Sequence, residues 1–333
     1  MKIRKDSVLN NESLVSIITS TYNKAKYLEL TLAGFVCQTY KNFEIVVVDD
    51  GSTDDTQKII KEYADKINIV YFRQENQGIA SARNTALKLA RGDYIIVIDD
   101  DRIPCPEFVY EHKRQLDINE KVLCIGKEGN ALSVFREGVI LDFNNKIKIF
   151  QEYPILQEVK YYELLNADDI IKDFQYAIRR CFLEYTSNSL QMEEYEKNFA
   201  EFYFAWSRAY GGNISFRRSM CKEEIYYDTQ YVGYGMEDID FSYQFYLQGF
   251  KYIYVEKAVN YHQEHPRGAD EGRSMYKNVS YFFKKYQTLE TILLKMDWEN
   301  KLTFNDVNSF LKILCKFYDT LEEAIKEFGK RGG

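Results

Sequence analysis

Short runs of apolar and β-branched residues alternate with stretches of helical periodicity over the first hundred positions of the chain. We predict strands at residues 15–19, 44–48, 69–73 and 94–98. We predict helices at residues 26–38, 53–65 and 80–90. Near-continuous apolar strands separated by helices indicate an α/β fold with a mostly parallel central sheet and helices on both faces.

The pattern becomes less regular after Pro104 and Pro106. Residues 157–204 are aromatic and charged, and they read as a helical insert without a partner strand. Regular elements return at residues 213–216, 238–247 and 251–255. From residue 270 the chain reads as helical and carries one apolar stripe, formed by Val307, Phe310, Leu311, Leu314, Phe317, Leu321, Ile325 and Phe328. We expect these helices to cap the preceding domain; a homodimer contact, or contact with a membrane or a protein acceptor, would also use such a stripe.

Composition and charge narrow the classes of protein that fit this pattern. The 333 residues are 45% hydrophobic and 16% aromatic, enough for the core of one large α/β domain with an appendage. The net charge of −7 gives no broad basic surface, so nucleic-acid binding is not expected. The chain has neither a signal-like apolar stretch nor a run of about 18 apolar residues, which predicts a cytoplasmic location, including one peripheral to the inner face of the membrane. The six scattered cysteines form no C-x-x-C pair and predict reduced, mostly buried thiols.

Polar segments follow three of the predicted strands. They are T-S-T-Y-N at residues 19–23, D-D-G-S-T-D at 49–54 and D-D-D-R at 99–102. Ligands of open parallel sheets bind beyond the carboxyl ends of the strands, which makes these segments candidates for a binding site. The second segment can equally be a strand end followed by a helix cap. The absence of G-x-G-x-x-G and of a P-loop argues against a dinucleotide or triphosphate cradle.

The triplet Asp99, Asp100 and Asp101 is either an acidic turn or a cation site. Three adjacent carboxylates repel one another, and a divalent cation would relieve that repulsion. Mg²⁺ or Mn²⁺ held by carboxylates and phosphate oxygens is the usual arrangement for nucleotide substrates. In an extended segment Asp99 and Asp101 would point to one side and Asp100 to the other, which predicts D-x-D as the working pair.

Two further segments carry candidate chemistry. The stretch 234–250 contains Glu237 and Asp238, which are either an acidic first helical turn or a site for a general base. The stretch Y-H-Q-E-H-P-R-G at residues 261–268 holds His262 and His265, each either a loop residue or a ligand. The third histidine, His112, lies in a charged helical stretch and is expected at the surface.

Taken together, S-I-I-T-S-T-Y-N, V-V-V-D-D-G-S-T-D, N-Q-G-I-A-S-A-R-N and I-D-D-D-R resemble family 2 glycosyltransferases with the GT-A fold. Later in the chain, Y-G-G-N-I-S-F-R-R, G-Y-G-M-E-D-I-D-F and Y-H-Q-E-H-P resemble segments of bacterial chondroitin and hyaluronan synthase modules. The resemblance implies a Rossmann-like GT-A domain over residues 14–268, with its insert at about 157–204. A tail at 1–13 and a C-terminal helical extension at 269–333 would flank it.

The resemblance implies a UDP-sugar donor and assigns roles to individual residues. Ser20, Tyr22 and Asp50 would line the uracil and ribose pocket. Arg83 and Asn84 would help to hold the nucleotide or the sugar.

The same resemblance implies a metal site. Asp99 and Asp100 would approach the ribose and sugar, and Asp101 would bind the metal. His262 would be a further ligand, which favours Mn²⁺ over Mg²⁺ because Mg²⁺ prefers oxygen ligands. His265 is expected to remain a loop residue.

The implied reaction is an inverting, metal-dependent glycosyl transfer. Asp238 would be the catalytic base and Glu237 would orient the acceptor, so that a UDP-α-sugar gives a β-linked product. The donor would be a UDP-hexose or UDP-N-acetylhexosamine. The acceptor would be a saccharide, a lipid-linked glycan or a peptide, in glycan or polysaccharide synthesis. Met236 stands where related modules often have glycine and would place a side chain near the acceptor or sugar pocket, so the sugar is not carried over.

Two other classes of protein share parts of this pattern. A nucleotidyltransferase would use a metal and acidic strand ends but would need a basic, glycine-rich loop for a triphosphate. A non-catalytic sugar-nucleotide-binding module would keep the pocket but would not need both the carboxylate cluster and the Glu237–Asp238 pair. The resembling polymerases carry two transferase modules and this chain has one, so alternating polymerisation by this chain alone is not expected.

Overall fold

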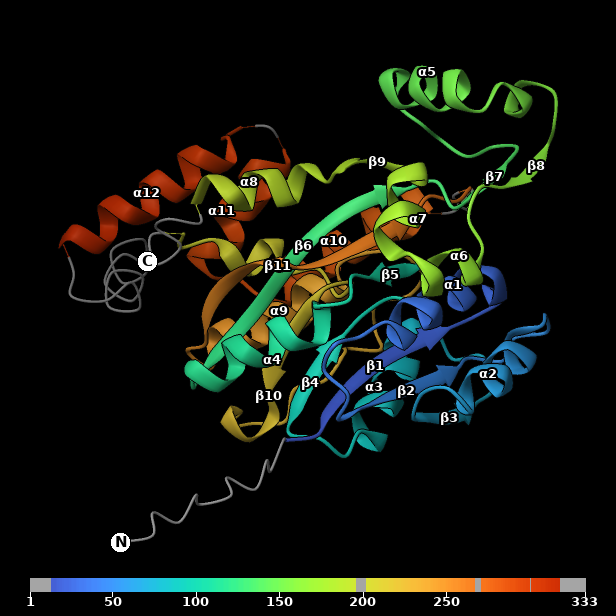
Figure 1. Cartoon of the computed structure of the whole chain (residues 1–333). Coiled ribbons are helices and arrows are strands. Elements are labelled where there is room, and N and C mark those ends of the chain that lie inside the picture. The colour runs from blue at the N-terminus through green and yellow to red at the C-terminus, as the bar shows by residue number, and fades with distance from the viewer. Residues whose placement is uncertain (1–12, 196–201, 267–270, 300, 318–333) are drawn as a thin grey trace, which may run out of the picture.

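The computed structural model describes residues 13–195, 202–266, 271–299 and 301–317. Its centre is a nine-stranded sheet in which eight strands follow the order β3-β2-β1-β4-β10-β6-β11-β5, while β9 pairs with β6 outside this path. Helices lie on both faces of this sheet (Figure 1). The α/β architecture predicted from the sequence is therefore confirmed.

The first half of the sheet is parallel, as the apolar runs predict. It is formed by β1 (Val15–Thr21), β2 (Phe43–Asp49), β3 (Ile69–Arg73) and β4 (Tyr94–Val97). The helices between these strands are α1 (Ala25–Val36), α2 (Thr56–Ala64) and α3 (Ile79–Leu89). Each predicted strand and helix of this half is present, with ends that differ from the prediction by at most three residues.

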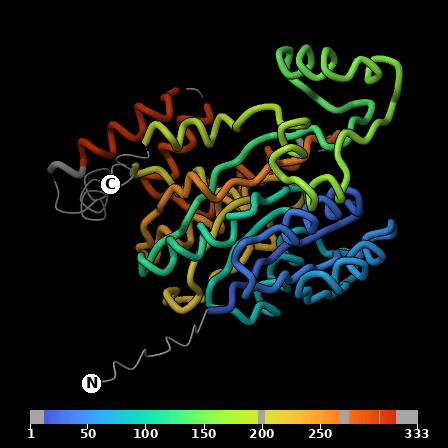
Figure 2. Tube along the Cα trace, in the orientation of Figure 1, coloured from blue at the N-terminus to red at the C-terminus, as the bar shows by residue number. Residues whose placement is uncertain are grey.

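The second half of the sheet is mixed in direction. Its strands are β5 (Arg102–Pro104), β6 (Val122–Ala131), β9 (Phe182–Tyr185), β10 (Ile214–Arg217) and β11 (Lys251–Gln263). Strand β10 is antiparallel to both β4 and β6, whereas β11 runs parallel to β6 and antiparallel to β5. The chain traces of β6 and β11 lie side by side over most of their length (Figure 2). The helices of this half that matter for the site are α4 (Phe108–Ile118) and α9 (Glu237–Leu247).

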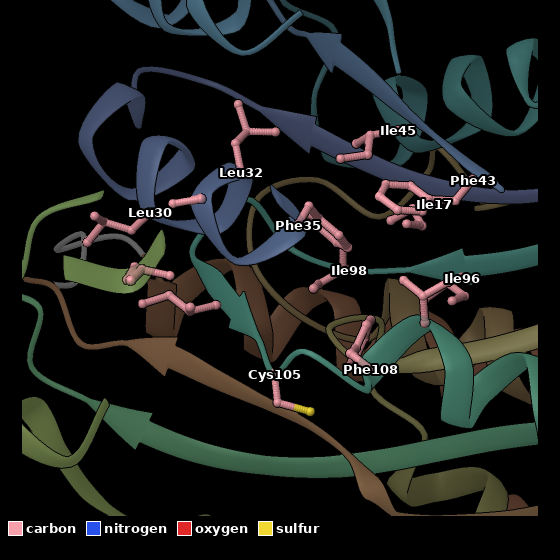
Figure 3. Packing of buried hydrophobic residues seen from close by; sticks show 14 of the residues in the cluster. Ile17, Leu30, Leu32, Phe35, Phe43, Ile45, Ile96, Ile98, Cys105 and Phe108 are labelled. Carbon is pink, nitrogen blue, oxygen red and sulfur yellow. The ribbon is translucent and has the colours of Figure 1, made fainter. Parts of the chain in front are cut away.

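One face of the sheet is covered by α1 and α4. The buried side chains Ile17, Ile45 and Ile96 point to this face, and Phe35 of α1 packs near Phe108 of α4 with 6.4 Å between ring centroids (Figure 3). Alternation of side chains along a strand sends the neighbouring residues to the opposite face, so a strand buried on both sides is apolar at almost every position. This explains the near-continuous apolar runs in the sequence.

The insert at 157–204 is not purely helical. It contains α6 (Ala167–Lys172), α7 (Phe174–Cys181) and α8 (Ser187–Tyr195), but also β9, which pairs antiparallel with β6. The prediction that the insert lacks a partner strand is therefore wrong. The sequence F-L-E-Y of β9 does not alternate apolar and polar residues, so it shows no strand period. The insert also contains β8 (Tyr161–Glu163), which pairs antiparallel with β7 (Val134–Arg136). Together with α5 (Phe143–Glu152) these two strands form a unit that projects from the body of the protein, at the upper right of Figure 1.

His112 is buried rather than exposed. Its ring lies between Ser215, whose Oγ is 2.8 Å from Nδ1, and Asn213, whose Oδ1 is 2.8 Å from Nε2. Burial lowers the pKa of His112 to about 4, which keeps the ring neutral. The surface prediction for this residue is wrong because His112 lies on the apolar face of α4, against Phe108.

The C-terminal helices pack against α9 and the segment 202–206. They are α10 (Glu271–Lys285), α11 (Leu289–Trp298) and α12 (Phe304–Phe317). Phe282, Leu294 and Leu311 are fully buried in one apolar cluster with Trp206 and Val46. These contacts support the capping interpretation for the described part of the stripe, whereas Leu321, Ile325 and Phe328 lie outside the described residues.

The cysteines and the lengths of the helices were also the subject of predictions from the sequence. The five cysteines whose side chains are described are free: Cys105, Cys124 and Cys181 are buried, and Cys37 and Cys221 are partly buried. Among the helices described here, none has the length and apolar character needed to cross a membrane.

Replacing Phe282 with alanine tests whether α10 is part of the folded core. Removal of this fully buried ring should lower the free energy of unfolding by about 3–5 kcal/mol, measured by urea denaturation. The control Tyr276→Ala removes a side chain of the same helix that is 77% exposed, and should change it by less than about 0.5 kcal/mol. Equal effects of the two substitutions would contradict the packing described for α10.

Candidate active site

Strand pairing brings together the acidic segment 99–101 and the histidine segment 261–268, which are far apart in the sequence. The register of β5 on β11 places Arg102 opposite His262, so the Asp99–Asp101 segment, which precedes β5, meets the end of β11. The backbone N–H of Gln263 donates to the carbonyl oxygen of Asp101 at 2.8 Å. The candidate site therefore lies at the carboxyl ends of the central strands, where ligands of α/β sheets bind.

The three aspartates form a turn rather than an extended segment, as the hydrogen bond from Arg102 N–H to Asp99 C=O shows. The Asp99 carboxylate faces Arg83 and Arg102, at 2.7 and 3.1 Å. Asp100 and Asp101 both face Lys24. The prediction that Asp99 and Asp101 share one side is wrong, because it assumed a straight strand through a segment that turns.

Asp101 lies beside both histidines of the late loop. His265 Nε2 is 3.2 Å from Asp101 Oδ2, and His262 Nε2 is 3.9 Å from Asp101 Oδ1. One ligand atom from each of the three residues lies within 4.8 Å of the others, and this is the one such group of three among the described residues. A carboxylate and two imidazoles are a donor set that suits Mn²⁺ and other first-row transition metals.

His265 was expected to remain a loop residue, and the structure corrects this. The chain beyond β11 stays on the site because the Glu264 N–H donates to Ala131 C=O at 2.8 Å. The His265 ring packs on Tyr27, with 5.5 Å between ring centroids. The hydrogen bond with Asp101 is the main cause that raises the pKa of His265. The group therefore contains both histidines.

Lys24 is a member of this site that the sequence interpretation missed. Its ammonium forms an ion pair with Asp101 and lies 3.7 Å from Asp100 Oδ1. Burial opposes the charge of Lys24, but the aspartates outweigh it and raise its pKa. Burial, together with the charge of Asp101, raises the pKa of Asp100 to about 6. Asp101 is buried as well, but its pKa lies well below the usual value for an aspartate. Lys24 directly follows the segment T-S-T-Y-N. Its position just after the first strand is the sequence feature that could have identified it as a site residue.

Arg83 connects the aspartate turn to the start of α9. This side chain is 3% exposed; Nη2 lies 2.7 Å from Asp99 Oδ1 and Nη1 lies 2.6 Å from Asp238 Oδ1. The Nη1 atom is also 3.6 Å from Glu237 Oε1. Arg83 was expected to hold the nucleotide or sugar, but in this structure its guanidinium binds protein carboxylates.

Glu237 and Asp238 are adjacent carboxyl groups that share this one guanidinium. Burial, reinforced by the charge of Asp238, raises the pKa of Glu237 to about 7. Burial also raises the pKa of Asp238, against the effect of Arg83. The Asp238 side chain is 21% exposed and can be reached by a substrate, whereas Glu237 is only 8% exposed and its Oε2 is buried without a hydrogen-bond partner. A β-carbon at Gly211 would collide with the Asp238 carboxylate, which explains a glycine at this position.

Arg102 and Glu128 form a second buried ion pair below the site. Arg102 Nη1 lies 3.0 Å from Glu128 Oε1, while Arg102 Nε bonds to Asp99. Glu128 was missed because it follows the apolar run V-L-C-I of β6 in the polar stretch G-K-E-G-N, where nothing in the local sequence marks a buried ion pair.

Two more of the predicted donor residues, Asp50 and Asn84, are hydrogen-bonded to protein groups. Asp50 accepts hydrogen bonds from Gln74 Nε2, Gln77 N–H and Gly78 N–H at 2.8 to 2.9 Å, so it organises the loop before α3. The Asn84 side chain both donates to and accepts from the backbone of Tyr227, which makes it an anchor of that loop.

Three further predicted positions differ in exposure. Ser20 is partly buried and Tyr22 is 50% exposed, so both are open to a ligand. Met236 is 3% exposed and packs in the apolar cluster, so its side chain does not project into an open acceptor pocket.

This chain is similar to known proteins over most of its length. The family model described as glycosyl transferase family 2 matches residues 16–158. Chondroitin synthase of Escherichia coli is 28% identical over 294 residues, which cover 84% of this chain and 40% of that protein. Hyaluronan synthase of Pasteurella multocida is 27% identical over 274 residues, which cover 80% of this chain and 26% of that protein. The chain thus spans less than half the length of either relative.

Solved structures show the same fold. TarS 1-349 of S. aureus has a TM-score of 0.52 and 19% identity, covering 93% of this chain and 80% of that one. TarS 1-349 in complex with UDP-GlcNAc has a TM-score of 0.50 and 20% identity, covering 81% of this chain and 66% of that one. The resemblance to family 2 glycosyltransferases and the GT-A fold are confirmed.

The raised pKa of Glu237 predicts a pH-dependent stability. A carboxyl whose pKa rises from 4.5 to about 7 on folding binds more protons in the folded state, so stability is lost as pH rises through this window. Glu237→Gln should remove this loss and raise the free energy of unfolding at pH 8, relative to its effect at pH 5, by up to ~3 kcal/mol. Urea denaturation at both pH values measures it. The control Glu137→Gln, on a side chain that is 68% exposed, should show no such difference, and a pH-independent effect of Glu237→Gln would contradict the assignment.

Proposed function

We propose that this protein is a family 2 glycosyltransferase, and that it transfers a sugar from a UDP-sugar to an acceptor hydroxyl with inversion at the anomeric carbon. The observation that carries this proposal is the bridge formed by Arg83. It holds the aspartate turn, with its candidate metal ligands, next to the buried carboxyl pair at the start of α9. Inverting transfer requires that the residues that hold the leaving group and the residue that acts as base lie close to each other.

Asp238 is the base in this mechanism. It is accessible, and its raised pKa makes it a better proton acceptor than an ordinary aspartate. As the acceptor oxygen bonds to the anomeric carbon, its proton passes to Asp238. The bond from that carbon to the UDP oxygen breaks, and UDP leaves with the electron pair. Glu237, with a pKa of about 7, is partly protonated at neutral pH and can orient the acceptor by a hydrogen bond.

Asp101, His262 and His265 would hold Mn²⁺, with Mg²⁺ less suited to two imidazoles. When bound, the ion would supply positive charge to the diphosphate of the leaving group. Lys24, which stays charged beside Asp100 and Asp101, contributes further positive charge on the same side. With the ion bound, the leaving-group side would carry net positive charge, whereas the acceptor side carries the carboxyl groups of Glu237 and Asp238.

The donor is a UDP-hexose or UDP-N-acetylhexosamine, and a UDP-α-sugar gives a β-linked saccharide. TarS binds UDP-GlcNAc, and the curated relatives are named chondroitin and hyaluronan synthases, which supports a UDP-sugar donor and a saccharide acceptor in polysaccharide synthesis. The test is UDP release from a panel of UDP-sugars with Mn²⁺, with and without EDTA. Release of pyrophosphate from a nucleoside triphosphate instead would favour a nucleotidyltransferase, and no metal-dependent UDP release from any donor would refute the proposal.

Asp238→Asn removes the proton acceptor and keeps the shape of the side chain. We expect kcat for transfer to fall by about 10²–10⁴-fold, the usual contribution of a general base, while UDP binding measured by calorimetry is retained. Asp117→Asn, on an exposed residue of α4, is the matched control and should retain wild-type kcat. Turnover of Asp238→Asn at the wild-type rate would remove Asp238 as the base.

Loss of either imidazole should weaken metal binding. We expect His262→Ala and His265→Ala each to raise the Mn²⁺ concentration for half-saturation by at least about tenfold, because even outer partners of a metal site contribute 10–100-fold. Electron paramagnetic resonance of free Mn²⁺ in titrations of the protein alone measures this without reference to activity. An unchanged titration for one variant would return that histidine to a loop role.

A further inference from the structure

The loop at residues 228–236, directly before Glu237 and Asp238, is held by helix α10. Asn278 of α10 donates from Nδ2 to the carbonyl oxygens of Val232, Tyr234 and Gly235 at 3.2, 3.2 and 2.9 Å. Its Oδ1 accepts from Val232 N–H at 3.4 Å. One side chain thus bonds backbone groups of three residues within the loop segment 232–235.

Lys285 attaches the same helix to both ends of this region. Its Nζ lies 2.7 Å from Asp228 Oδ2 at the start of the loop and 2.7 Å from Asp240 Oδ2 in the first turn of α9. The Asp240 side chain is fully buried and also accepts from Tyr231 OH at 2.9 Å. Tyr281 OH donates to Asp228 Oδ2 at 3.0 Å. The ion pairs therefore fix the loop and the start of α9 relative to each other through α10.

The residues of α10 that make these contacts lie on one side of the helix. Asn278, Tyr281 and Lys285 are three and four positions apart, which places them along one stripe. Met275, a further three positions back, fills the space where a β-carbon of Gly235 would lie. The loop is thus in close contact with α10 over about three turns.

The loop conformation needs such support. Gly233, Gly235 and Met236 have φ values of 76°, 94° and 75°. A left-handed conformation is available to glycine but costs a residue such as Met236 of order 1 kcal/mol or more, and it persists only where the surroundings fix it. Met236 immediately precedes Glu237, so relaxation at Met236 would change the direction of the first turn of α9.

We propose that α10 is a positioning element of the acceptor side of the active site. Asn278 and Lys285 act as positioning residues: they hold loop 228–236 so that Glu237 and Asp238 keep their places beside Arg83. This inference rests on the proposed role of Asp238 as base. It also extends the catalytic unit beyond residue 268, into a segment that the sequence assigned to a separate extension.

The test compares Asn278→Asp and Lys285→Met with the control Lys284→Met. Asn278→Asp keeps the shape but replaces the donating amide by a carboxyl facing three carbonyl oxygens. Lys284 is exposed and one position from Lys285, so its replacement removes the same charge without touching the loop. Hydrogen exchange of peptides covering residues 228–240 reports on the loop, and calorimetry with UDP reports on the donor side.

We expect both test variants to speed exchange in residues 228–240, to lower kcat by about 10²-fold and to raise the acceptor KM, with donor affinity unchanged. Lys284→Met should match the wild type in each measurement, and Lys285→Arg, which keeps the charge, should restore most of kcat. A fall in kcat that follows thermal stability alone, with wild-type exchange in the loop, would overturn the positioning role.

The two proposals fail in different ways. If the wild-type protein releases no UDP from any donor, the proposed function is refuted, and the exchange measurement still decides whether α10 holds the loop. If the wild type is active and the Asn278→Asp variant keeps wild-type kcat, acceptor KM and loop exchange, the positioning role is wrong and the proposed function stands.

Discussion

The buried guanidinium of Arg83 is the interaction on which the rest of the site depends. A charge at 3% exposure is tolerated only where opposite charges surround it, and Asp99, Glu237 and Asp238 provide them. Because Asp99 follows β4 and Asp238 begins α9, this one side chain of α3 fixes the relative positions of three elements. Removal of Arg83 itself would leave Glu237 and Asp238 without the guanidinium that they share, so this side chain links the donor and acceptor sides of the site.

Different surroundings within the site give chemically similar carboxyl groups different pKa values. Near Lys24 and the two histidines, Asp101 is held ionised despite burial, which is the state that binding of a metal ion would require. Near Arg83, two carboxyls compete for one cation, and burial raises the pKa of both. Separation of the pKa values of acidic residues by their surroundings is the usual way in which one site obtains both charge stabilisation and base catalysis.

The parallel half of the fold and most of the candidate residues were predictable from local sequence, because strands buried on both faces leave continuous apolar runs. What could not be predicted depends on contacts between distant segments. The direction of the Asp99 side chain follows from a turn. The approach of His265 to Asp101 follows from the pairing of β5 with β11. The burial of His112 follows from packing on Phe108 and β10. Met236 was expected to place its side chain near the acceptor or sugar pocket, and its burial could not be predicted because it depends on the whole apolar cluster.

The position of β11 between β6 and β5 has a consequence for biosynthesis. Residues 251–263 must pair with residues 122–131 and 102–104, so the sheet is completed only when these late residues have left the ribosome. Contacts between such distant segments form slowly, and until then the nascent chain carries strands with unpaired edges. Such a chain should rely on chaperones more than its size alone suggests, because exposed strand edges and apolar surface promote aggregation during synthesis. Ribosome-bound intermediates would contain the parallel half of the sheet, while both the histidines and the carboxyl pair would arrive late.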